Sequence, residues 1–101
     1  AIRQSVKTDT TVIATATNLV STRHYFVDTT IGSITVTFPA SPSLGDTIYV
    51  SDAYGTWDTN NCIVNPNSEK INGVTGNSTL SSEYDSKEYI YIGGTAGWRT
   101  V

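Results

Sequence analysis

VTFPASPSLGDTIYVSD, residues 36–52, is the stretch that decides the fold. Apolar and polar residues alternate at both of its ends, which is the pattern of β-strands that bury one face. The alternating apolar residues are Val36 and Phe38 at the first end, which continue the alternation from Ile34 just before it, and Ile48 and Val50 at the second. Pro39 and Pro42 stop the first strand, because proline has no backbone N–H to donate. The stretch therefore predicts two core strands joined by a proline-stopped loop, with Asp46 and Asp52 supplying turn hydrogen bonds at the strand ends.

Short strands of the same kind are predicted along the rest of the chain, at 25–27, 62–64, 70–71, 79–81, 88–92 and 98–101. Asn72-Gly73 is a two-residue hairpin signal, since both residues tolerate a positive φ. Gly93-Gly94 predicts that the last two strands also form a hairpin. No long segment has the 3.6-residue apolar period of an amphipathic helix. The pattern predicts an all-β fold, a small antiparallel β-sandwich or barrel of about eight short strands.

The first part of the chain differs from the rest. Residues 10–17 are β-prone but carry little bulk and no aromatic side chain. We expect residues 1–22 to form an extended arm or connector strand and residues 23–101 to form the β-domain. The sequence leaves open whether this part forms an edge strand of the same chain or an arm that exchanges between subunits.

Composition narrows the classes of function. The chain has 101 residues, a length typical of one domain, with a net charge of −3 and only 15% charged residues. Its six Lys and Arg residues are scattered, so nucleic-acid binding has no electrostatic basis. No apolar run approaches the ~20 residues that span a bilayer, so we expect no membrane insertion. Low charge favours surfaces that become subunit contacts, because few charges need to lose their water there.

Side chains that carry chemistry are few. His24 is the only histidine and Cys62 the only cysteine, whereas a structural zinc site needs about four such ligands. We predict no catalytic residue, no metal site and no cofactor, with His24 on the surface or at an interface and Cys62 buried. Two alternatives stay open: three copies of His24 around a trimer axis, and a pair of carboxylates facing each other across a sugar cleft.

One loop is the candidate for a binding surface. Tyr54 and Trp57 lie in the polar segment 52–61 beside Asp58 and Asn60. Exposed aromatic rings beside acid and amide groups suit a glycan or a protein partner, so these four residues form the candidate contact site. The alternative is that Trp57 caps one end of the core, because Trp is usually largely buried.

Residues 25–101 resemble a module that recurs in tail-fibre and baseplate proteins of tailed bacteriophages of the myovirus type. The resemblance rests on short phrases in a fixed order: VTFPASP at 36–42, GD at 45–46, NN at 60–61, NPN at 65–67 and GWR at 97–99. It implies a structural virion protein that forms a homotrimer and contacts other phage tail proteins. It also implies location in the phage tail after synthesis in the host cytoplasm. The alternative function is host attachment, with a host-surface polysaccharide bound by the loop aromatics, and we expect the chain not to be an enzyme.

Overall fold

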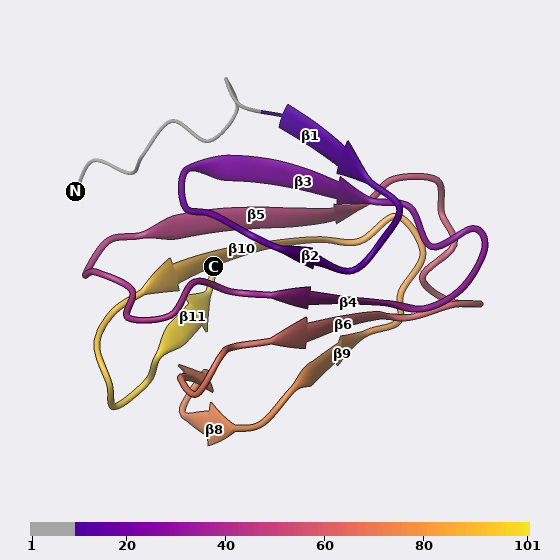
Figure 1. The fold of residues 1–101 in the computed structure, drawn as a ribbon. Coiled ribbons are helices and arrows are strands. Elements are labelled where there is room, and N and C mark those ends of the chain that lie inside the picture. The colour runs from indigo at the N-terminus through magenta and orange to yellow at the C-terminus, as the bar shows by residue number, and fades with distance from the viewer. Residues whose placement is uncertain (1–9) are drawn as a thin grey trace.

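Two β-sheets face each other across one apolar core in the computed structural model, which describes residues 10–101 (Figure 1). The seven-stranded sheet contains, in spatial order, β1 (Thr10–Ile13), β3 (Arg23–Val27), β5 (Thr47–Asp52), β10 (Ser86–Tyr91), β11 (Trp98–Thr100), β7 (Lys70–Ile71) and β8 (Val74–Thr75). The four-stranded sheet contains β2 (Thr17–Asn18), β4 (Ile34–Thr37), β6 (Cys62–Asn65) and β9 (Ser78–Leu80). No helix occurs among the described residues, which confirms the all-β class.

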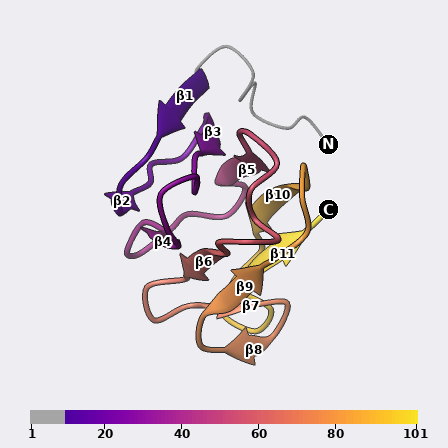
Figure 2. The same ribbon diagram turned by 90° about the vertical axis from the view of Figure 1, so that its right-hand side faces the viewer.

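The first six strands form a flattened coil, which we call the parallel coil (residues 10–65). The chain alternates between the sheets, and each strand pairs in parallel with the strand two before it. Thus β1, β3 and β5 run one way and β2, β4 and β6 run the other (Figure 1). Viewed along the strands, β1, β3, β5 and β10 form one layer and β2, β4 and β6 form a second (Figure 2).

The rest of the chain closes the sandwich with mostly antiparallel strands. β9 pairs antiparallel with β6, β10 with β5, and β11 with β10, while β7 lies parallel to β11. The expected antiparallel arrangement therefore holds for the second part of the chain and is wrong for the parallel coil. The reason is that each connection in the coil crosses to the opposite sheet, so a returning strand points the same way as its neighbour.

The hairpin predicted at Asn72-Gly73 joins β7 to β8. Asn72 has φ 50° and Gly73 has φ 78°, as a type I′ turn requires. The hairpin predicted from β10 to β11 is also present. The structure has eleven strands rather than about eight: β1 and β2 lie in the part expected to be an arm, and β8 is a two-residue pairing too short to show a period.

The described part of the N-terminal arm adds an edge strand to each sheet. β1 pairs with β3 and β2 pairs with β4. Leu19 follows β2, donates its N–H to the Thr37 carbonyl at 2.8 Å and is buried in the core. Residues 1–9 of the expected arm lie outside the described residues, and the division at residue 22 stays a prediction.

The core follows from the alternation seen in the sequence. Ile34, Val36, Phe38, Ile48 and Val50 are all buried, as their spacing predicts. Phe38 contacts Tyr89 and Trp98 edge-on, at ring centroid distances of 5.0 and 4.8 Å. Such aromatic pairs add about 0.5–1.5 kcal/mol beyond their buried area. Cys62 is buried as predicted, and burial raises the pKa of its thiol to about 12.

Candidate functional site

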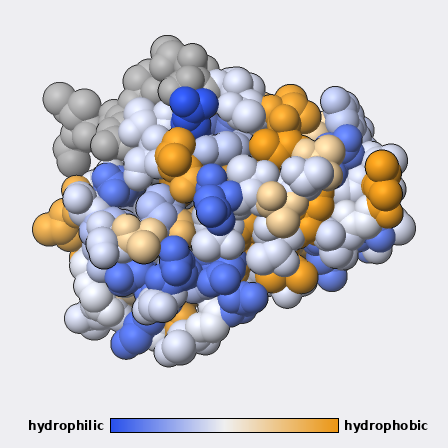
Figure 3. Space-filling view, in the orientation of Figure 1, coloured by the Kyte–Doolittle hydropathy of each residue, from blue (hydrophilic) through white to orange (hydrophobic). Residues whose placement is uncertain are grey.

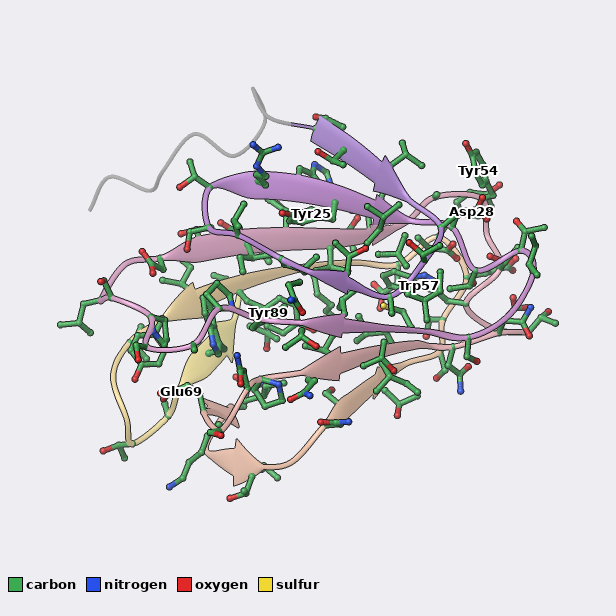
Figure 4. All side chains as sticks on the ribbon, in the orientation of Figure 1. Tyr25, Asp28, Tyr54, Trp57, Glu69 and Tyr89 are labelled. Atoms are coloured by element: carbon green, nitrogen blue, oxygen red, sulfur yellow. The ribbon has the colours of Figure 1, made fainter. Side chains whose placement is uncertain are left out.

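The loops β3–β4 (residues 28–33), β5–β6 (residues 53–61) and β9–β10 (residues 81–85) leave the sheets at the same end, which we call the loop end. Tyr54, Trp57 and Asp28 mark it at the right of Figure 4. The β5–β6 loop, which carries the expected site, follows strand β5. The β9–β10 loop leads into β10, the strand that pairs with β5. The loop end is therefore where the sequence-predicted contact residues are positioned.

The carboxylate of Asp52 organises the loop end. It accepts hydrogen bonds from the backbone N–H groups of Gly55, Thr56 and Trp57 at 3.1 Å and from that of Tyr84 at 2.9 Å. Burial by itself raises the pKa of Asp52, but the backbone donors outweigh it and hold the pKa below its ordinary value. Asp52 is thus the turn residue the sequence predicts, and it also joins two loops that are far apart in the chain.

Trp57 does not offer a ring to a ligand. Its side chain has no exposed surface, and its Nε1 donates to the Val27 carbonyl at 3.3 Å. Including Trp57 in the contact site is therefore wrong, and the alternative that it caps the core is confirmed. The backbone N–H of Trp57 donates to the carboxylate of Asp52. The polar residues around Trp57 in the sequence give no sign of this contact.

Asn60 has a structural task, whereas Asp58 is exposed. The Asn60 Nδ2 donates to the Thr29 carbonyl at 2.9 Å and lies 3.4 Å from the Thr30 carbonyl. The amide of Asn60 thereby fixes the β3–β4 loop against the β5–β6 loop. Of the four predicted contact residues, Tyr54 and Asp58 keep side chains available to a partner.

Two tyrosines project from the loop end. Tyr54 is 57% exposed and Tyr84 is 69% exposed. The ring of Tyr84 covers the backbone of Gly55, where a Cβ would lie 2.7 Å from Cζ of Tyr84. The structure therefore places Tyr84 beside the loop that carries Tyr54. Sequence reasoning missed this neighbour because the two loops lie far apart in the chain and meet through contacts with Asp52 and Gly55 that no local pattern encodes.

His24 belongs to a chain of hydroxyl contacts across three strands. Its Nε2 lies 2.6 Å from Oγ of Ser51, which lies 2.5 Å from Oγ of Ser86. The imidazole also stacks on Phe26, with ring centroids 4.3 Å apart. Ser51 is buried and its hydroxyl contacts two neighbours, so this cluster joins β3, β5 and β10 and leaves no room for a substrate at Ser51.

The sequence matches no protein-family model and no curated protein. Residues 10–101 contain no group of three or more His, Cys, Asp or Glu side chains that could hold a metal ion. Within the same range, no helix is long and apolar enough to cross a membrane. The basis for a function is therefore the geometry of the two sheets and their loops.

Proposed function

We propose that this chain is a structural module of a bacteriophage tail protein, part of a fibre or a baseplate, and that it assembles as a homotrimer without catalysing a reaction. The observation that carries this proposal is the parallel coil. Its first two strands, β1 and β2, each form the edge of one sheet. Edge strands offer backbone groups to which a further strand can add. The phage-tail resemblance of residues 25–101 supports the same role.

The surface agrees with assembly through polar contacts. On the face shown in Figure 3, exposed hydrophobic side chains form several separate patches between hydrophilic ones. Charged residues make up only 15% of the chain, so close subunit contacts desolvate few charges. The partners proposed are two further copies of the chain and other phage tail proteins, in the virion after synthesis in the host cytoplasm.

Sedimentation equilibrium tests the assembly. We expect a species of about three times the 10.9 kDa chain mass. Val12 on β1 is 57% exposed, and Val12→Lys places a charge at the edge strand, which should shift the distribution towards monomer. Ile92→Lys is the matched control, because Ile92 is 51% exposed but lies beyond the end of β10, away from β1. A purely monomeric wild-type protein at high concentration would contradict the proposal.

A second function, attachment to a host-surface polysaccharide, is favoured by one observation. Tyr54 and Tyr84 are exposed on two loops that Asp52 holds together. Two exposed rings on loops that are held in place can stack on sugar faces with little loss of conformational freedom. This surface replaces the sequence-predicted one, with Tyr84 in the place of the buried Trp57.

Glycan screening separates this function from the structural one. We expect binding to at least one host polysaccharide, weakened about tenfold by Tyr54→Ala or Tyr84→Ala, which corresponds to about 1.4 kcal/mol. Val74→Ala, at an exposed residue of β8 outside the loop end, should leave binding unchanged. Absence of binding to every host polysaccharide would leave the structural role alone.

A further inference from the structure

A pocket lies away from the loop end, where β11, the β7–β8 turn and the β10–β11 turn meet. These elements are at the lower left of Figure 1. Its volume is about 390 Å³, towards the small end of the range for ligand sites. The lining residues are Asn72, Gly73, Thr95, Ala96, Arg99 and Thr100. A space of this size suits one sugar residue or a small ion with its first waters.

The walls of the pocket are held together by four hydrogen bonds. The backbone N–H of Asn72 donates to the Trp98 carbonyl at 2.9 Å, and that of Gly73 donates to the Ala96 carbonyl at 2.8 Å. The Asn72 amide donates from Nδ2 to Oγ1 of Thr100 at 2.9 Å and accepts at Oδ1 from the Thr100 N–H at 3.0 Å. The pocket is therefore formed before any ligand arrives, which lowers the entropic cost of binding.

The pocket offers hydrogen-bond donors and one positive charge. Arg99 is the only charged residue among those that line it, and it is exposed. Within residues 10–101 its guanidinium makes one long hydrogen bond, 3.4 Å from NH1 to the Thr100 carbonyl, and no ion pair. The Thr100 hydroxyl accepts from Asn72, so its own hydrogen remains free to donate. The lining of the pocket thus carries one positive charge in a chain whose net charge is −3.

We propose that this Arg99 pocket is a binding site for a single oxyanion group, either the carboxylate of an acidic sugar or a phosphate. A planar guanidinium pairs with the two oxygens of such a group through parallel N–H donors. Thr95 and Thr100 also line the pocket, and their hydroxyls are further hydrogen-bond donors there. Because Arg99 is exposed to water, the affinity expected for an isolated anion is weak, on the order of 1 mM or weaker, and falls with added salt.

The proposal does not depend on trimer formation or on the tyrosines of the loop end. A protein that sediments as a monomer, or that loses no glycan binding in Tyr84→Ala, still carries the Arg99 pocket. The three proposals therefore succeed or fail separately.

Amide chemical shifts of the isotope-labelled protein test the pocket directly. Glucuronate and inorganic phosphate are titrated separately, with uncharged glucose as the ligand control. We expect saturable shifts centred on Gly73, Ala96, Arg99 and Thr100, weakened severalfold at about 1 M salt, where the Debye length is about 3 Å. Shifts with glucuronate alone identify a carboxylate site, and shifts with phosphate alone identify a phosphate site. No saturable shift with either anion, or equal shifts with glucose, would overturn the proposal.

Variants link the shifts to the guanidinium. Arg99→Gln should abolish saturation, and Arg99→Lys should weaken it severalfold because a lysine cannot pair through two parallel donors. Lys87→Gln is the matched control, since it removes the same charge from β10 but does not line the pocket. Retained binding in Arg99→Gln would contradict the site. The spread of the amide chemical shifts of this variant shows whether it folds, and an unchanged spread confirms that it does. If Arg99→Gln fails to fold, undiminished binding in Arg99→Lys overturns the bidentate pairing.

Discussion

Replacing Gly97 with alanine is expected to destabilise the protein by about 4 kcal/mol or more, from a total stability on the order of 5–15 kcal/mol. Gly97 has φ +74°, in the left-handed region that costs other residues about 1–2 kcal/mol. A Cβ on Gly97 would also overlap the backbone carbonyl oxygen of Lys70 and lie 2.6 Å from its carbonyl carbon. Neither backbone can yield without separating β11 from β7, which pair through Trp98 and Ile71.

Thermal unfolding measured by circular dichroism checks this result, with a fall in Tm of about 20 °C expected for a domain of this size. Gly76→Ala is the matched control. Gly76 also has a positive φ, of +103°, but a Cβ there would meet nothing within 4 Å. We expect Gly76→Ala to lose only about 1–2 kcal/mol. Equal losses in the two variants would contradict the close approach of Gly97 to Lys70.

Asp52→Asn is expected to destabilise the protein by about 3 kcal/mol, because hydrogen bonds to a charged acceptor are the strong ones. The carboxylate Oδ2 accepts from the backbone N–H of both Trp57 and Tyr84, and Oδ1 accepts from Gly55 and Thr56. An amide has only one acceptor oxygen, so its NH₂ group would face two N–H donors in either orientation. Urea unfolding at neutral pH measures the loss.

The same variant should change how stability depends on pH. The folded protein holds the pKa of Asp52 below its ordinary value, which is about 3.9 in unfolded chains. The stabilisation is therefore complete well above that value and is lost as the pH falls through the lower, folded pKa. Asp28 also has a lowered pKa, caused by hydrogen bonds from Thr30, so Asp52→Asn should reduce the acid sensitivity without removing it.

Asp58→Asn is the control for both measurements, since Asp58 lies exposed in the same loop. This variant should stay within about 0.5 kcal/mol of the wild type. It should also keep the wild-type slope of stability against pH. An Asp52→Asn protein with the full acid slope of the wild type would show that Asp52 does not hold the two loops through its charge.

The sequence predicts the strands better than it predicts how they pair. Residues at every second position mark the buried face equally well for parallel and antiparallel partners, so the two strands around Pro39 and Pro42 were predictable but the parallel coil was not. The turn at Asn72-Gly73 was predictable because its chemistry is local. A sequence pattern can predict a local hairpin of this kind, but it does not predict that the connections of the parallel coil cross from one sheet to the other.

The candidate sites show the same limit. Asp52 was predictable as a turn residue, but its bond to Tyr84 joins residues 32 positions apart. The polar neighbours of Trp57 suggested an exposed ring. In the structure the backbone of Trp57 is hydrogen-bonded to Asp52, and its side chain is buried in the core. The Arg99 pocket depends on Asn72 meeting Thr100, 28 positions away, and no short motif encodes that contact.

The parallel coil also has a consequence for the order in which the protein can fold. Among strands β1 to β6, no strand pairs with the next one along the chain, so none of their pairings can start from a tight turn. Thr10 must find His24, and Arg23 must find Ile48, before β1, β3 and β5 can pair with one another. Long-range closures of this kind are slow, with folding times of milliseconds to seconds in comparable all-β domains. The local hairpins at β7–β8 and β10–β11 come late in the chain, so a growing polypeptide exposes its coil-forming strands well before these partners have been synthesised.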